Sequence, residues 1–273
     1  MTGASDWQGR VGASWAAEWQ RTDRSFAVLN ARLVEHVAAL APANAQILDV
    51  GCGAGGTSLA LAERLPDAQI RGIDLSADLI AVARERAGGE VAFEQADASL
   101  WSSPDFVPDL LVSRHGVMFF DDPVGAMRHL ASVTRPGGQF IFSCFRDRRE
   151  NDWATAVAGL LPAPLPFDPL APGPFAFADK DRVTAILSQA GWTDISAAPH
   201  DLAYIAGAGD RPVDDAVDFF SQIGPAAPII RALQGDEQAA MLARLRDMVS
   251  KHLHNGAVSF TASVWIWTAH RPK

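Results

Sequence analysis

Short apolar runs alternate with helix-like segments along residues 46–144. The runs are short enough to be buried strands, and between them apolar side chains recur every three or four residues, as on one face of a helix. Five strands are expected, at residues 46–50, 69–74, 91–95, 109–113 and 139–144. Because strands and helices alternate, the pattern predicts a parallel sheet with helices on both faces. Helical spacing before residue 42 predicts an N-terminal helical arm.

The pattern changes after residue 146. Residues 162–174 contain six prolines, a density that excludes a helix or a central strand and predicts a lid or linker. Further helices are expected at residues 179–190 and over most of 213–253. Two strand-like segments, at residues 195–206 and 258–269, enclose the second helical stretch. They predict an antiparallel pair of strands at one edge of the sheet.

The charge balance is acidic, with 23 Lys and Arg against 32 Asp and Glu and a net charge of -9. Clustered Lys and Arg bind phosphate backbones and anionic lipids, so this balance argues against a nucleic acid or a membrane surface as the partner. The chain has no apolar run long enough for a transmembrane helix, and its N-terminal region lacks the apolar stretch of a secretory signal. A cytoplasmic protein is therefore expected.

The two cysteines, Cys52 and Cys144, are too few for a disulfide scaffold or for the usual zinc sites built on paired cysteines. They come at the ends of the first and fifth expected strands. One strand would separate them in the sheet, which puts them about 10 Å apart, beyond the reach of a disulfide. Two free thiols are expected, and no metal site.

A glycine-rich loop follows the first expected strand. Glycines allow a tight turn and a close approach of the backbone to a ligand, and the helix N-terminus behind them attracts negative charge. Gly51, Gly53 and Gly56, with Asp74 about 20 residues later, match the dinucleotide-binding fingerprint. This match leaves a NAD-dependent oxidoreductase open.

Asp49 favours a different cofactor. It stands directly before the glycines, where its carboxylate would repel a pyrophosphate. The same carboxylate would attract a ligand that carries an ammonium and a sulfonium group, as S-adenosylmethionine does.

Five segments carry a family resemblance, in order along residues 46–145. They are Leu48-Asp-Val-Gly-Cys-Gly-Ala-Gly55, Gly72-Ile-Asp-Leu-Ser76, Gln95-Ala-Asp-Ala98, Asp109-Leu-Leu-Val-Ser-Arg114 and Arg135-Pro-Gly-Gly138. Together they resemble the motifs of class I S-adenosylmethionine-dependent methyltransferases. The Trp-rich arm and the C-terminal part resemble a bacterial branch that acts on small molecules.

The resemblance implies an α/β fold with a doubly wound, Rossmann-like, seven-stranded sheet whose last strand is antiparallel. It implies one methyltransferase domain over residues 1–273, with the helical arm at 1–45 and a cofactor-binding core at 46–145. Residues 147–178 and 207–257 would then be helical lid insertions over the active site.

The resemblance also implies a set of cofactor-binding residues. They are Asp49, Gly51, Cys52, Gly53, Gly55, Asp74, Leu75, Asp97, Ala98, Arg114 and Trp15. Asp74 would bind the ribose hydroxyls and Asp97 the adenine amine, with Leu75 and Ala98 as apolar contacts. The backbone near Arg114 would complete the site.

Several of these residues have a purely structural alternative. Asp49 could cap the glycine loop, Asp74 could be a solvated strand end, and Asp97 could form an Asx-turn. Cys52 could be a small buried apolar residue. Trp15 could close over the cofactor or simply pack within the arm.

His115 is the candidate catalytic residue. It follows the fourth expected strand, where the ligand crevice of a doubly wound fold opens. With an ordinary pKa of about 6.5, its ring could take a proton from a hydroxyl or amine acceptor. The alternative is a histidine that packs beside the cofactor without handling a proton.

Two further groups bear on the acceptor. The basic run Arg146, Arg148 and Arg149 is either a solvated turn or a contact with an acidic substrate. Aromatic residues in the proline-rich region line an apolar acceptor pocket or form the private core of the lid. These residues are Trp153, Phe167, Phe175 and Phe177.

The leading hypothesis is the transfer of a methyl group from S-adenosylmethionine to a small organic acceptor, with an aromatic or polyketide-like acceptor as a working guess. The methylated atom is left open. The alternatives are a NAD-dependent oxidoreductase and a non-catalytic accessory protein that binds S-adenosylmethionine.

Overall fold

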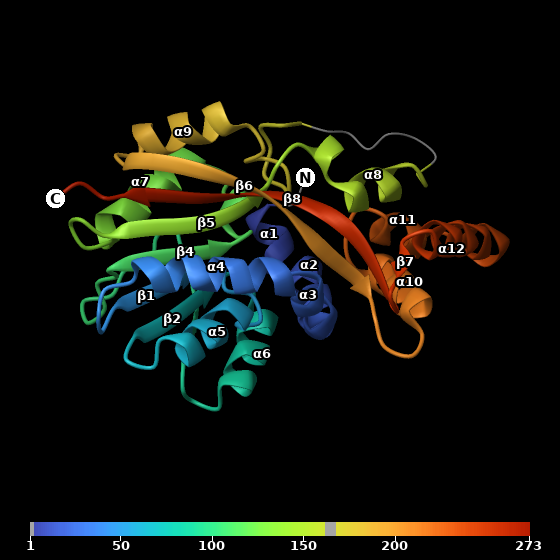
Figure 1. Cartoon of the computed structure of the whole chain (residues 1–273), viewed down its shortest axis with the longest axis horizontal. Helices are drawn as coiled ribbons and strands as arrows, with labels where there is room; N and C mark the ends of the chain where they lie inside the picture. Colours follow the sequence, from blue (N-terminus) through green and yellow to red (C-terminus); the bar gives the residue numbers. More distant parts are fainter. Residues whose placement is uncertain (1–2, 162–167) are drawn as a thin grey trace.

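The computed structural model describes residues 3–161 and 168–273. Five parallel strands form the centre of one sheet (Figure 1). They are β1 (Gln46–Val50), β2 (Gln69–Asp74), β3 (Ala92–Gln95), β4 (Leu110–Arg114) and β5 (Gln139–Phe145). All five expected strands are present, with bounds that agree to within one residue.

The strand order is β3-β2-β1-β4-β5, so it reverses between β1 and β4. Right-handed crossovers therefore place the helices after β1 and β2 on one face and the helix after β4 on the other. These helices are α5 (Gly56–Arg64), α6 (Ala77–Ala87) and α7 (Pro123–Val133). The doubly wound arrangement predicted from the sequence is confirmed.

Two long strands complete the sheet. The last one, β8 (Ala257–His270), lies antiparallel between β5 and the edge strand β6 (Thr193–Gly207). This confirms the seven-stranded order with an antiparallel last strand. A two-residue strand that the sequence did not predict, β7 (Leu253–His254), pairs with β8 and makes the sheet eight-stranded.

Both long strands extend well beyond the parallel strands, toward the right of Figure 1. Between them the chain forms α10 (Pro212–Gln222), α11 (Ala227–Ala232) and α12 (Gly235–Ser250). The expected helical stretch is therefore present, as three separate helices. They lie at the end of the sheet toward which β5 points.

The N-terminal arm consists of α1 (Ala4–Trp7), α2 (Arg10–Ala17), α3 (Trp19–Ser25) and α4 (Ala27–Leu40). Helix α2 packs on α6, and α3 packs on β6. A side chain at Gly12 would place its Cβ 2.3 Å from Ser76 Oγ, so the close approach of α2 to the start of α6 requires glycine. The arm thus connects the parallel part of the sheet, through α6, with the edge strand β6.

The insertion after β5 begins with the short helix η2 (Arg148–Glu150) and α8 (Asp152–Ala158), and it ends at α9 (Lys180–Gln189). Of the residues singled out in the proline-rich stretch, Pro162, Pro164, Pro166 and Phe167 lie outside the described residues. The part from 168 to 178 forms turns and bends. The N–H of Gly173 donates to Met118 O at 3.1 Å, which joins this part to the segment after β4.

Large aromatic side chains fill the core against one face of β5. Phe140, Phe142, Trp192 and Trp267 are all fully buried. Trp192 also donates its indole N–H to Met127 O at 2.9 Å, which ties the start of β6 to α7. Within the described residues, no helix is both long and apolar enough to cross a membrane.

Candidate active site

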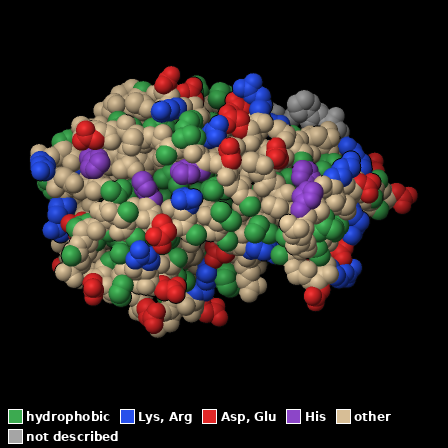
Figure 2. Space-filling view, viewed as in Figure 1, with side chains coloured by type: hydrophobic (Ala, Val, Ile, Leu, Met, Phe, Trp, Pro, Cys, Tyr) green, Lys and Arg blue, Asp and Glu red, His purple; other side chains and the backbone are tan. Residues whose placement is uncertain are grey.

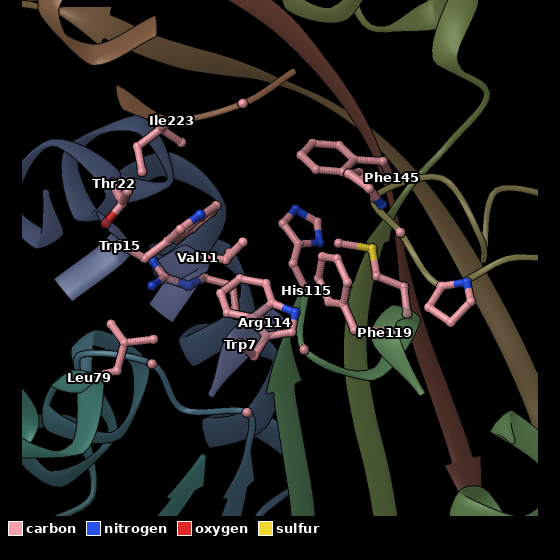
Figure 3. A pocket seen from close by; sticks show the side chains of 18 of the residues that line it. Trp7, Val11, Trp15, Thr22, Leu79, Arg114, His115, Phe119, Phe145 and Ile223 are labelled. Carbon is pink, nitrogen blue, oxygen red and sulfur yellow. The ribbon is translucent and has the colours of Figure 1, made fainter. Parts of the chain in front are cut away.

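A cavity of about 1030 Å³ lies at the carboxyl ends of β1, β2, β4 and β5 (Figure 3). One part of its wall, called the loop end below, comes from the turns after the strands. It contains Gly51, Cys52, Gly53, Asp74, Leu75, Asp97 and Ala98. The other part, called the lid end, comes from the two insertions and from strands β5 and β6, and it contains Phe145, Arg148, Trp153, Phe175, Tyr204 and Arg231.

The glycine loop turns sharply because three of its residues have left-handed backbone angles: Gly51 (φ 68°), Gly53 (φ 55°) and Gly55 (φ 82°). A Cβ at Gly53 would meet no heavy atom within 4 Å, so this residue faces open space in the cavity. A Cβ at Gly55 would instead lie 2.7 Å from the ring of Phe93. Gly55 therefore allows close packing of the loop on β3 and is not part of the cavity wall.

Asp74 lies on the wall and already organises the loop. Its Oδ2 accepts a hydrogen bond from the Gly53 N–H at 2.9 Å, and its Oδ1 accepts one from the Ser76 N–H at 2.9 Å. Burial raises the pKa of Asp74 above its ordinary value, although these backbone donors oppose the rise. Each carboxylate oxygen has a second lone pair, so Asp74 can still accept hydrogen bonds from a ligand.

Asp97 has the structural role that the sequence left open. Its Oδ1 accepts hydrogen bonds from the Ser99 N–H at 2.8 Å and the Ser99 Oγ at 2.7 Å, which is an Asx-turn. Asp97 also lies on the cavity wall, beside Ala98 and across the loop end from Leu75. The turn leaves its other carboxylate oxygen for a ligand, so the two interpretations of Asp97 are compatible.

Asp49 lies beneath the glycine loop and does not reach the cavity wall. It is 1% exposed, and its Oδ2 accepts a hydrogen bond from Ser58 Oγ at 2.6 Å. Its Oδ1 is buried without a partner among the described residues. Desolvation raises the pKa of Asp49 to about 6. Asp49 can therefore act on a bound cofactor through its charge, but not through direct contact.

Asp23 of the arm is a wall residue that the sequence interpretation missed. Its carboxylate binds Arg114 at 3.2 Å and Arg86 at 2.7 Å. A Cβ at Gly56 would lie 2.6 Å from Asp23 Oδ1, so the Asp23 carboxylate occupies the N-terminus of α5. The glycine that matched the dinucleotide fingerprint is thus explained by a carboxylate of the arm.

Trp15 is half-buried and lies on the cavity wall, as its assignment to the cofactor requires. Its ring contacts Trp7 edge-on at 5.5 Å and stacks on Phe26 at 6.5 Å. Packing within the arm and contact with the cavity therefore occur together. That Trp15 also closes over a ligand stays a prediction.

His115 separates the two ends of the cavity. In Figure 3 its ring lies between Trp7, Trp15 and Arg114 on one side and Phe145 on the other. The ring stacks on Phe145 at 4.2 Å, and the backbone adopts φ 61°, which is uncommon for a residue other than glycine. This backbone angle turns the side chain into the cavity at the end of β4.

Both nitrogens of the His115 imidazole are buried. Nδ1 lies 3.4 Å from Ser143 Oγ, and the backbone N–H of His115 donates to Ser143 O at 3.2 Å. Nε2 is buried without a partner among the described residues.

The pKa of His115 corrects one expectation. Desolvation, with a smaller contribution from the charge of the nearby Arg114, lowers it to about 3, so the ordinary value assumed from the sequence is wrong for this environment. His115 is therefore neutral at physiological pH. A neutral ring can orient an acceptor by accepting its hydrogen bond, but it is a weak general base.

We expect the stability of the protein to fall as the pH falls from 6.5 toward 3. In this window the unfolded chain protonates His115 at its ordinary pKa, whereas the folded chain does so only near pH 3. The contribution approaches about 1.4 kcal/mol per pH unit. Urea unfolding of the wild type and His115→Phe at pH 7, 6 and 5 measures it. A pH-independent cost of the phenylalanine shifts the free energy of unfolding equally at every pH and leaves its slope unchanged. Parallel plots of this free energy against pH for the two proteins would therefore contradict the lowered pKa of His115.

Aromatic rings line the lid end, as the apolar-pocket alternative requires. Trp153 stacks on Phe175 at 5.8 Å and on Tyr204 at 5.5 Å. The indole N–H of Trp153 is buried without a partner within the described part of the chain. Phe177 does not reach the wall and instead packs on Phe142 at 6.3 Å. The lid aromatics therefore divide between the pocket and the core.

Both cysteines are buried free thiols, as predicted. Cys52 lies on the wall within the glycine loop, and desolvation raises its pKa well above the ordinary value. Cys144 lies behind the wall, and burial raises its pKa to about 12. Because the thiolate is the reactive form, neither residue is a nucleophile at neutral pH.

Comparison with known families agrees with this geometry. Residues 47–138 match the family model of a methyltransferase domain. The chain carries a class I S-adenosylmethionine-dependent methyltransferase domain. The methyl donor of the domain is S-adenosylmethionine.

Two relatives illustrate the similarity of this methyltransferase to curated enzymes. Trans-aconitate 2-methyltransferase of Variovorax paradoxus is 28% identical over 215 residues, which cover 77% of this chain and 79% of that protein. Phosphoethanolamine N-methyltransferase 1 of Arabidopsis thaliana is 38% identical over 101 residues, which cover 36% of this chain and 20% of that protein. The chain spans less than half the length of several curated relatives that it matches.

The fold of the methyltransferase also matches solved structures. YcgJ of Bacillus subtilis superposes with a TM-score of 0.58 at 19% identity, over 89% of this chain and 99% of that chain. At this identity the match shows the fold alone. The residues that sequence reasoning missed, such as Asp23, lie outside the matched segment 47–138, where no motif marks them.

Proposed function

We propose that the whole protein is a small-molecule methyltransferase that binds S-adenosylmethionine at the loop end and its acceptor at the lid end. One observation carries the proposal: the glycine loop and Asp74 line the same cavity as an aromatic wall formed by the insertions. When bound, S-adenosylmethionine supplies an activated methyl group, so the protein needs chiefly to align the acceptor and exclude water.

The residues at the loop end fit this cofactor. Gly53 faces open space, where a ligand can approach the backbone. Asp74 has lone pairs for the ribose hydroxyls and Asp97 for the adenine amine, with Leu75 and Ala98 as apolar neighbours. Gly51 and Cys52 shape the same turn, whose N–H groups both donate to Ile73 O.

The charged groups of the arm fit the amino-acid part of the cofactor. Asp23 carries the negative charge that suits an ammonium, and Arg114 carries the positive charge that suits a carboxylate. Both lie on the wall beside Trp15. Asp49 adds a buried negative charge beneath the loop, without contact.

His115 would orient the acceptor. We assign its imidazole ring, which belongs to a residue of the cavity wall, to accept a hydrogen bond from the hydroxyl or amine that receives the methyl group. The aromatic wall around Trp153 excludes water from this point. Because the ring is a weak base, the methylated acceptor releases its proton to solvent after the transfer, and His115 acts by positioning.

A NAD-dependent oxidoreductase is disfavoured by Asp23. In dinucleotide-binding folds the pyrophosphate lies at the N-terminus of the first helix after the glycine loop. Here that position is taken by the Asp23 carboxylate, 2.6 Å from where a Cβ of Gly56 would lie. A pyrophosphate would have to displace it.

Titration calorimetry tests the proposal directly. The wild type is titrated separately with S-adenosylmethionine, S-adenosylhomocysteine and NAD. We expect both sulfur ligands to bind and NAD not to bind. Release of S-adenosylhomocysteine during an acceptor screen then separates an enzyme from an accessory protein, which would bind the cofactor but release none.

Replacing Asp74 with alanine is expected to weaken S-adenosylmethionine binding by about 1–3 kcal/mol, the usual cost of losing a hydrogen bond to a charged group. Calorimetry measures the change. Asp78→Ala is the matched control, because Asp78 is an exposed acid at the start of α6 that does not line the cavity. Equal affinity in a folded Asp74 variant would remove Asp74 from the ribose site.

A further inference from the structure

The structure sorts the three arginines of the basic run after β5 into two classes. Arg146 forms ion pairs with Glu150 and with Asp201, the latter at 3.1 Å. Arg149 is paired with Asp147 at 2.7 Å and is exposed to solvent. Arg148 has no ion pair and donates no side-chain hydrogen bond among the described residues, and it alone of the three lines the cavity.

We propose that Arg148 binds a carboxylate of the methyl acceptor, so that the substrate of this enzyme is a small organic acid with a planar, apolar body. This inference rests on the proposed function, since it assigns the lid end to the acceptor. The planar guanidinium matches a carboxylate with two parallel hydrogen bonds.

The surroundings of Arg148 favour an anionic partner. Its neighbours on the wall are apolar, with Trp153 and Ala154 on α8 and Phe145 at the end of β5. A half-buried guanidinium in such surroundings lacks the compensation that a paired charge has. A carboxylate bound there would supply both the opposite charge and the missing acceptors, while the aromatic rings would cover the rest of the ligand.

The other charged residues at the lid end also favour an anionic ligand. Arg231 of α11 lines the cavity without a carboxylate partner in the described part of the chain; it only approaches Gln222 O, at 3.4 Å. The acid on this part of the wall, Asp168, is exposed and accepts the Leu170 N–H at 2.8 Å. Residues 162–167 contain no ionisable side chain.

The remaining wall arginines belong to the loop end. Arg114 is neutralised by Asp23, and Arg10 lies on α2, which packs on α6. The lid end thus has two arginines against one acid in a protein whose net charge is -9. A local excess of positive charge inside a cleft attracts anions, whatever the sign of the outer surface.

Matched acids and amides test the inference. The probes are benzoate, 4-hydroxybenzoate, cinnamate and 4-hydroxyphenylacetate, each compared with its primary amide. Each is titrated into the protein saturated with S-adenosylhomocysteine, as wild type, Arg148→Gln and Arg149→Gln. Arg149→Gln is the control, because it removes the same charge from the same turn but outside the cavity.

We expect acids to bind the wild type at least tenfold more tightly than their amides. The preference should disappear in Arg148→Gln and persist in Arg149→Gln. If the wild type shows no preference for acids across the probes, or if the preference survives in Arg148→Gln, the inference is overturned.

The cofactor titration keeps this inference separate from the proposed function. S-adenosylmethionine should bind Arg148→Gln within twofold of the wild-type affinity, because Arg148 lies at the lid end. If the wild type does not bind S-adenosylmethionine, the proposed function fails. If it binds the cofactor and releases S-adenosylhomocysteine with amides as readily as with acids, only the assignment of Arg148 fails.

Discussion

Replacing Gly116 with alanine is expected to destabilise the protein by about 3 kcal/mol, at the upper end of what overpacking costs. The new Cβ would lie 2.7 Å from Val50 O, 2.8 Å from Ser113 Oγ and 3.1 Å from Gly51 Cα. Two of these three atoms belong to the backbone of β1 and the glycine loop, which cannot rotate away. The substitution should also break the hydrogen bond from Ser113 Oγ to Val50 O, which is 2.6 Å long.

Gly53→Ala provides the matched comparison. Its Cβ would meet no heavy atom within 4 Å, so the substitution costs only the left-handed backbone angle, about 1–2 kcal/mol. Because this Cβ points into the cavity, it should weaken S-adenosylmethionine binding. Urea unfolding and calorimetry of both variants measure the two effects. Equal losses of stability in Gly116→Ala and Gly53→Ala would contradict the prediction. They would show that the backbone of β1 and the segment after β4 can move apart enough to accommodate the new Cβ.

Replacing Asp49 with asparagine is expected to stabilise the protein and to weaken cofactor binding. Desolvation raises the pKa of Asp49 from 3.8 to about 6, so the folded protein holds a proton between these values that the unfolded chain has released. The contribution of Asp49 to stability therefore falls as the pH rises through this window. Above pH 6 the buried charge costs about 3 kcal/mol, at about 1.4 kcal/mol per pKa unit.

The asparagine keeps the shape of the side chain and its carbonyl can still accept from Ser58 Oγ. We expect the free energy of unfolding at pH 8 to rise by about 1–3 kcal/mol, with little gain at pH 4, where Asp49 is protonated in the folded state. Without the buried charge, affinity for the cationic cofactor should fall. Asp67→Asn, an exposed acid before β2, is the control. A variant less stable at pH 8 would contradict the assigned cost.

Gly53 and Gly116 differ in whether a sequence motif marks them. The glycine loop is recognisable in the sequence because glycines cluster there, whereas the structure shows open space beside Gly53, where a Cβ would meet no heavy atom within 4 Å. Gly116 lies outside any glycine cluster, and its importance comes from the backbone of β1 on the other side of the contact. Sequence position alone gives no signal of that neighbour.

Local patterns in the sequence were sufficient for the five central strands, the helical arm, the antiparallel pair at the sheet edge and the glycine-rich loop, whereas the seven-stranded arrangement was implied by the family resemblance. Apolar periodicity depends on which face a residue buries, and the turn motifs depend on glycine and acid at fixed spacing, so both are properties of short segments. The short strand β7 escaped prediction because two residues carry no periodicity.

Only the tertiary structure decided the properties that depend on residues distant in the chain. Asp23 meets Arg114 across 91 positions, and no motif connects them. Desolvation lowers the pKa of His115 to about 3 and raises the pKa of Asp49 to about 6. Desolvation depends on all the side chains packed around a group, and these come from distant parts of the chain. The same packing left Arg148 without an acidic partner among the described residues, while Arg146 and Arg149 are paired with acids.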